Sequence, residues 1–120
     1  GKLSGAVGTF ANVDPWVEPP LAPTSLTATN LGRQGNNNRI RLTWTNVPGE
    51  TGYRIQRAND AAFTLGVVNT ARAADTTGAP TVSALLSVPR NPVGRTYYYR
   101  VQSVNPMGSD WSPTASIVTR

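Results

Sequence analysis

Short segments in which apolar and polar side chains alternate constrain the fold of this chain more than any other feature. In residues 39–44, every second side chain is large and apolar, namely Ile40, Leu42 and Trp44. A period of two places successive side chains on opposite faces of a β-strand. Residues 53–57, 81–88 and 97–103 alternate in the same way. We therefore predict strands with one buried face in all four segments.

Turn-forming residues separate these segments. Gly, Pro and Asn are concentrated in residues 31–38, 46–52 and 89–94, which we predict to be loops. The run Asn36–Asn38 is interpreted as part of a flexible loop and not as a calcium site. Further short strands are expected at 26–28, 63–68 and 114–119, whereas 71–80 gives no clear assignment. About seven short strands with no helical period predict an all-β sandwich or barrel.

The first 20 residues differ from the rest in composition. Residues 1–20 are rich in Gly, Pro and small side chains, and they end at Pro19–Pro20. We interpret them as a linker or the tail of a preceding domain, although Phe10 and Trp16 are unusual in a linker. The beginning of the chain lacks the pattern of a signal peptide. Residues 21–120 are expected to form one domain with its own core.

The residue inventory argues against catalysis. The chain has no cysteine and no histidine, so it lacks thiol nucleophiles, the commonest general base and the commonest metal ligands. The carboxylates all fall in predicted loops or in residues 1–20: Asp14, Glu18, Glu50, Asp60, Asp75 and Asp110. Turn chemistry accounts for acidic residues at such places. We expect no enzymatic activity, no metal site and no cofactor.

The positive charges are scattered along the chain. The net charge is +5, and Lys2 is the only lysine among the 11 basic residues. No run of five to eight basic residues is present, so the signal for a nucleic-acid partner is weak. No apolar run approaches the roughly 20 residues that span a membrane. We therefore interpret the arginines as a solvated surface, and expect neither a nucleic-acid nor a membrane partner.

Four pieces of the chain, in their order and spacing, resemble a fibronectin type III domain. They are PLAPTSLTA (20–28), RIRLTW (39–44), GYRIQR (52–57) and TYYYRVQSVNPMGSDWSP (96–113), which resemble strand A, strand B, strand C and strands F to G of that family. The resemblance implies a seven-stranded, immunoglobulin-like antiparallel β-sandwich. Its expected core is Ile40, Leu42, Trp44, Tyr53, Ile55, Tyr97, Tyr99, Val101 and Ile117.

The resemblance also implies roles for the tyrosines of residues 97–99. Tyr97 stands four residues before Val101, as the tyrosine of the family's tyrosine corner does, and its hydroxyl would bind the preceding loop. Asn91 occupies the place where the family usually has a leucine. Alternation puts Tyr97 and Tyr99 in the core and leaves Tyr98 on the surface.

The outward side chains of strands C, F and G form one candidate surface, which we call the C–F–G patch. It consists of Arg54, Gln56, Tyr98, Arg100, Gln102 and Trp111. Aromatic, amide and guanidinium groups suit both sugar rings and protein interfaces. The other interpretation is a cross-strand ladder in which arginines stack on Trp111 and Tyr98. We favour the ladder, because such a stack needs no ligand to exist.

The resemblance favours a non-catalytic spacer, structural or protein-interaction module within a larger extracellular or cell-surface bacterial protein. Its expected partners are neighbouring domains of the same chain, and we expect a monomer. The alternative is an accessory carbohydrate-binding module that uses Tyr98, Arg100 and Trp111 of the C–F–G patch. Polysaccharide or protein ligands thus remain open at this point.

Overall fold

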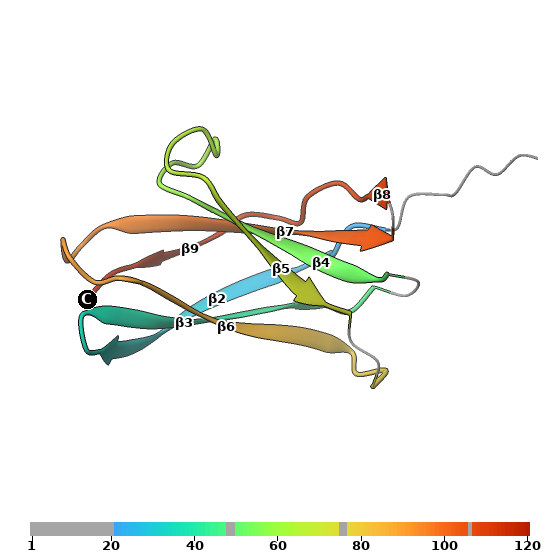
Figure 1. Ribbon diagram of the computed structural model, residues 1–120, viewed down its shortest axis with the longest axis horizontal. Helices are drawn as coiled ribbons and strands as arrows, with labels where there is room; N and C mark the ends of the chain where they lie inside the picture. Colours follow the sequence, from blue (N-terminus) through green and yellow to red (C-terminus); the bar gives the residue numbers. More distant parts are fainter. Residues whose placement is uncertain (1–20, 48–49, 75–76, 106) are drawn as a thin grey trace, which may run out of the picture.

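The computed structural model describes residues 21–47, 50–74, 77–105 and 107–120, which form two antiparallel β-sheets packed face to face (Figure 1). One sheet has the order β2–β3–β6, with β2 at Leu26–Gln34, β3 at Asn37–Thr45 and β6 at Thr81–Pro89. The other has the order β5–β4–β7–β8, with β5 at Val68–Ala73, β4 at Gly52–Ala58, β7 at Thr96–Asn105 and β8 at Met107–Gly108. β9, at Ala115–Val118, also pairs with β7.

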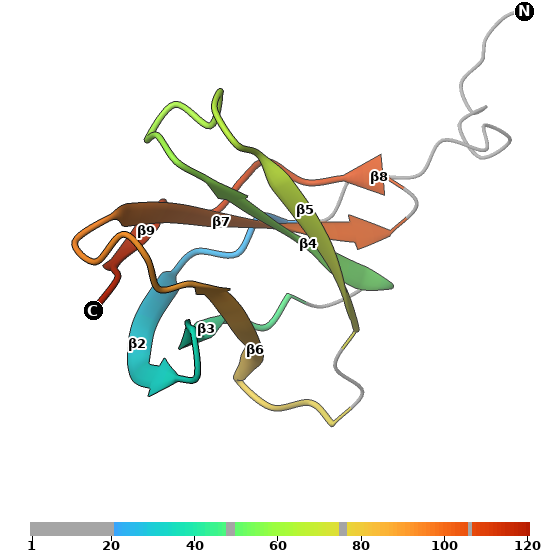
Figure 2. The same ribbon diagram turned by 60° about the vertical axis from the view of Figure 1, so that its left-hand side comes forward.

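The last two strands together complete the second sheet. β8 pairs with the end of β7 at Val104, and β9 pairs with its beginning, where Ala115 lies opposite Tyr99. Counted as one interrupted strand, they bring the described part of the chain to seven strands. Figure 2 shows β2, β3 and β6 as one layer, and β4, β5 and β7 as the other. The predicted immunoglobulin-like sandwich is therefore confirmed.

The predicted core is confirmed at every position. All nine side chains expected inside are buried, from Trp44 at 0% exposed to Ile117 at 5%. Trp44 packs edge-on against Tyr53, with ring centroids 5.2 Å apart. Val82 and Val88 of β6 are buried on the same side, as the alternation of residues 81–88 predicts. Alternation thus places the inner face of both sheets correctly.

The predicted loop at residues 31–38 is wrong. β2 continues to Gln34 and β3 begins at Asn37, so only Gly35 and Asn36 form the turn. Gly35 has a φ of 61°, which suits a tight hairpin turn. Asn38 is fully buried, and its side chain exchanges two 2.8 Å hydrogen bonds with the backbone of Arg120. A polar side chain can therefore be buried in a strand when its hydrogen bonds are made within the protein, and polarity alone does not identify a loop.

The expected strand at residues 63–68 is also wrong, because β5 begins only at Val68. The preceding residues form a loop organised by the Asp60 carboxylate. Asp60 Oδ1 accepts hydrogen bonds from the backbone amides of Thr64 and Leu65, at 2.8 and 2.9 Å. Phe63 adopts a φ of 58°, in the left-handed region. The apolar residues of this segment therefore belong to a loop that the Asp60 carboxylate caps and that folds back over the sheet.

The loop before β7 is held differently from what the resemblance implied. Among the described residues, Tyr97 forms no hydrogen bond to that loop. Instead, Thr119 Oγ1 donates to the carbonyl oxygen of Pro92 at 2.8 Å and accepts from the amide of Arg95 at 3.0 Å. The amide of Gly94 donates to the Thr119 carbonyl at 2.9 Å. The end of the chain therefore ties this corner, and Tyr97 contributes its buried ring.

The predicted linker, residues 1–20, lies outside the described residues. Within the described part of the chain, no helix is long and apolar enough to cross a membrane.

Candidate functional site

The structure brings the C–F–G patch together on the outer face of the second sheet. β4 and β7 pair in a register that sets Arg54 opposite Gln102 and Gln56 opposite Arg100. Directly opposed residues of an antiparallel pair project from the same face. Arg54 is exposed, and the other five side chains of the patch are half-buried. The outward orientation expected from alternation is therefore present.

A chain of hydrogen bonds joins the polar members of this patch. Arg54 Nη1 donates to Gln102 Oε1 at 3.1 Å, and Gln102 Nε2 donates to the carbonyl oxygen of Ser109 at 2.7 Å. Arg100 Nε donates to Gln56 Oε1 at 2.7 Å. Gln56 Nε2 in turn donates to Asn69 Oδ1 of β5 at 3.1 Å. The side-chain amides that a sugar ligand would need are thus already engaged across the sheet.

Arg100 lies between two aromatic rings, an arrangement that we call the Arg100 stack. Its guanidinium carbon is 4.3 Å from the ring centroid of Trp111 and 4.2 Å from that of Phe63. Both distances lie within the range of a cation–π contact. Burial lowers the pKa of Arg100 from its ordinary value. The guanidinium of Arg100 thus contacts one ring from the β4–β5 loop and one ring from the segment that follows β8.

Sequence reasoning found one ring of this stack and missed the other. Trp111 was expected to stack on an arginine, and it does. The second ring is Phe63, from the β4–β5 loop, and Tyr98 takes no part in the ring contacts among the described residues. Phe63 is only 8% exposed although it lies in a loop. The sequence signal that could have indicated this loop was Asp60, which stands four residues before Thr64. At that spacing a carboxylate can cap a turn.

The Asp60 cap holds Phe63 in place. The hydroxyl of Thr64 and the backbone amides of Leu65 and Thr64 donate to its carboxylate. These hydrogen bonds, with that of the Thr64 hydroxyl as the largest cause, lower the pKa of Asp60 below its ordinary value of 3.8. The charged carboxylate therefore orders the loop that supplies the second ring.

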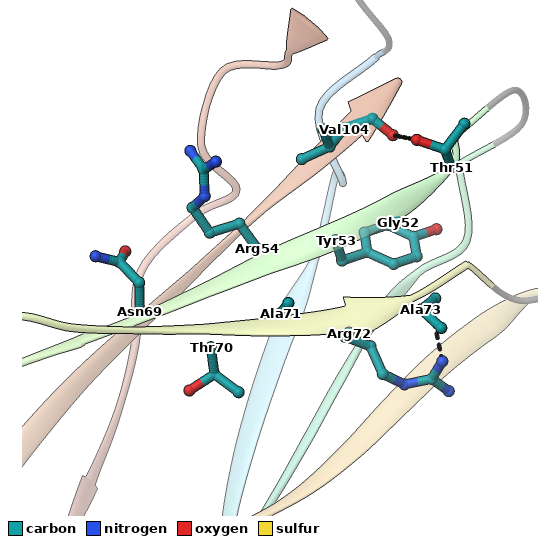
Figure 3. Close-up of a pocket in the computed structure, with 10 residues that line it drawn as sticks. All are labelled: Thr51, Gly52, Tyr53, Arg54, Asn69, Thr70, Ala71, Arg72, Ala73 and Val104. Carbon is teal, nitrogen blue, oxygen red and sulfur yellow. Dashed lines mark hydrogen bonds between the residues drawn. The ribbon is translucent and has the colours of Figure 1, made fainter. Parts of the chain in front are cut away.

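A second concave region lies at the β4–β5 edge of the same sheet (Figure 3). This open groove of about 530 Å³ is lined by Thr51, Gly52, Tyr53, Arg54, Asn69, Thr70, Ala71, Arg72, Ala73 and Val104. Thr51 Oγ1 donates to the Val104 carbonyl oxygen at 3.1 Å, and Arg72 Nη1 donates to that of Ala73 at 2.6 Å. Two of its polar side chains are thus bound to backbone within the groove.

Tyr53 is the titratable group of this groove that has the strongest shift. Burial first, and then the nearby Glu50 carboxylate, raise the pKa of its hydroxyl to about 12. That hydroxyl donates to Glu50 Oε2 at 2.6 Å and accepts from the amide of Val47 at 3.0 Å. A hydroxyl so protonated is a poor base or nucleophile near neutral pH. Among the described residues, no group of three or more acidic, histidine or cysteine side chains gathers as a metal site would require.

The comparisons with known proteins agree with this architecture. No family model matches the chain, and no curated protein matches it in sequence. Among 24 matching chains of solved structures is an Fn3-like protein from Clostridium thermocellum. The two chains are 25% identical, and the match covers 82% of this chain and 92% of that one with a TM-score of 0.55.

Proposed function

We propose, from the premise that this chain is a fibronectin type III-like β-sandwich domain, that it is a non-catalytic structural module which spaces or connects neighbouring domains. We place it within a larger extracellular bacterial protein, with residues 1–20 as its linker. The likeness to an Fn3-like protein of Clostridium thermocellum supports the module part of this proposal. The role itself rests on the chemistry of the surface.

The observation that carries the structural role is that the side chains of the C–F–G patch bind one another and neighbouring residues of the same domain. Arg100 donates from Nε to Gln56, and its guanidinium contacts the rings of Phe63 and Trp111. Gln56 and Gln102 each donate to a protein oxygen, and each accepts from an arginine. A ligand that took over these donors and acceptors would have to displace the contacts within the sheet, which costs free energy. The patch therefore favours sheet stability over sugar recognition.

The test is a tryptophan-fluorescence titration of the full chain with soluble neutral oligosaccharides, paired with pull-down on insoluble cellulose. Trp44 is 0% exposed and should stay silent. A Trp16→Phe variant removes the reporter in residues 1–20 and leaves Trp111 as the responsive ring. A structural module gives no saturable change and no pull-down. A saturable shift that Trp111→Ala abolishes would make the chain a carbohydrate-binding module instead.

The same Trp111→Ala variant has a stability readout. Removing one ring of the Arg100 stack should lower the free energy of unfolding by about 1 kcal/mol. Urea unfolding followed by far-ultraviolet circular dichroism measures this loss without depending on any ligand. Unchanged stability together with lost sugar binding would contradict the structural role.

A further inference from the structure

A small cavity lies between the two sheets, where their edge strands face each other. In the described part of the chain, β5 is an end strand of one sheet and β6 is an end strand of the other. Side chains from β4, β5, β6 and β7 line a cavity of about 70 Å³ at this place. We call it the Arg57 cavity and define it by its polar lining residues, Arg57, Thr70, Ser87 and Tyr99.

The strand register turns Arg57 towards the inside of the sandwich. Arg57 lies opposite Val68 of β5 and opposite Tyr99 of β7. Directly opposed residues share one face of a sheet, and Tyr99 is 0% exposed in the core. The guanidinium carbon of Arg57 is 5.0 Å from the ring centroid of Tyr97, which is also buried. A positive charge is therefore present on the inner face of the β5–β4–β7 sheet.

Two buried polar atoms of the lining residues lack a hydrogen-bond partner among the described residues. They are Nε of Arg57 and the hydroxyl oxygen of Tyr99. Nearby carboxylates in the chain are engaged elsewhere, since Glu50 accepts from Tyr53 and Asp60 caps the β4–β5 loop. Buried polar groups are nearly always paired, and a buried charge is costly unless it is neutralised. The partner of Arg57 must therefore come from outside the described residues.

The groups that line the cavity favour an acceptor with negative charge. The Nε–H group of Arg57 is a donor only. Burial raises the pKa of the Tyr99 hydroxyl above its ordinary value, so that hydroxyl stays protonated and can donate at neutral pH. The hydroxyls of Thr70 and Ser87 can donate as well, and no carboxylate lines the cavity. The ring of Tyr97 attracts the guanidinium but supplies no oxygen to Nε–H.

We propose that the Arg57 cavity binds one small monovalent anion, such as chloride, through Nε of Arg57 and the hydroxyl of Tyr99. One arginine supplies one positive charge to the site, which matches a monovalent ion. A single water needs about 10–15 Å³ of such space, so 70 Å³ admits one ion with a few waters. Drug-sized ligands occupy about 300–1,000 Å³, which excludes them here.

An ion can reach this site without separation of the two sheets. Thr70 of β5 and Ser87 of β6 are exposed and also line the cavity. The cavity therefore meets the solvent between the two strand edges. Water can enter by the same path, and a water molecule would satisfy Nε–H of Arg57 without neutralising its charge. The charge of Arg57 is thus the reason to expect an anion at this site, and the test distinguishes the two occupants.

The test follows thermal unfolding of the full chain, and the proposal does not depend on the spacer role. Sodium chloride would replace sodium gluconate at constant total salt, because gluconate is too large for the cavity. An ion that binds only the folded state stabilises it by mass action. The unfolding temperature should therefore rise with chloride and reach a plateau, by about 4 °C or more. Equal unfolding temperatures in the two salts would overturn the proposal.

Three variants assign this effect to the cavity. Tyr99→Phe removes one donor and should weaken the apparent chloride affinity by about tenfold, whereas Arg57→Met should abolish the rise. The matched control is Tyr97→Phe, which removes the same atom from an inward tyrosine that does not line the cavity, and it should keep the full rise. The same chloride-dependent rise in all three variants would contradict the assignment.

A crystal of the parent chain grown in sodium bromide would locate the ion directly, by the anomalous scattering of bromine. The expected result is one bromide in the cavity, within hydrogen-bond distance of Arg57 Nε and the Tyr99 hydroxyl. Water alone at this position, with no bromine signal, would overturn the proposal.

Discussion

The two outer faces of this sandwich use arginine in opposite ways. On the β4–β7 face, Arg100 is hydrogen-bonded to Gln56 and enclosed by Phe63 and Trp111. On the β2–β3–β6 face, the side chain of Arg41 is exposed and forms no hydrogen bond or ion pair with another described residue. The residue type is the same and the strand geometry is the same. What differs is whether the neighbouring elements supply rings and acceptors, and this decides whether a cation stabilises the fold or remains available to a ligand.

The largest expected effect comes from the core that both faces share. Trp44 is 0% exposed and lies on β3, in contact with Tyr53 of the opposite sheet. Trp44→Ala should lower the free energy of unfolding by about 3–5 kcal/mol, through lost burial and a residual cavity. Urea unfolding measures it, with the exposed Val93→Ala as the control. Native stability in the Trp44 variant would mean that the two sheets do not depend on this contact.

The next largest effect is expected at Arg100, whose contacts distinguish the β4–β7 face from the β2–β3–β6 face. Arg100→Met should lower the free energy of unfolding by about 1–2 kcal/mol, because it removes two cation–π contacts and one charged hydrogen bond. Arg100 and Phe63 should also show coupling in a double-mutant cycle, since they touch. Urea unfolding of Arg100→Met, Phe63→Ala and the double variant gives both numbers. Additive losses would show that the contact between Arg100 and Phe63 contributes no interaction energy to the fold.

Much of this comparison could be predicted from the sequence, and the rest depended on contacts between distant segments. Alternation in residues 39–44 and 97–103 identified the buried and outward side chains correctly. It could not identify Phe63, because the ring belongs to a loop whose path is set by a side-chain cap. The extension of β2 to Gln34 was missed for a related reason. A two-residue turn joins β2 to β3, whereas the Gly and Asn content of residues 31–38 predicted a long loop.

A pH dependence should reveal how the β4–β5 loop supports the stack. The folded-state pKa of Asp60 is lowered, so its charged form stabilises the fold above pH 3.8 and that contribution is lost as the pH falls further. Asp60→Asn should therefore lose less stability than the parent chain between pH 5 and pH 2. Thr64→Val removes the main donor and should reduce the dependence in part. Identical acid profiles for all three chains would contradict the role of the cap.

The smallest expected effect belongs to the open face. Arg41→Ala removes an exposed side chain that has no partner among the described residues, so stability should change by no more than about 0.5 kcal/mol. Thermal unfolding at low and high salt measures it. Because Arg39 and Arg41 repel each other with no carboxylate between them, the variant should be slightly more stable at low salt, and the difference should vanish as salt screens the charges. A clear loss of stability instead would mean that Arg41 already has an anionic partner within the chain, which would remove the contrast between the two faces.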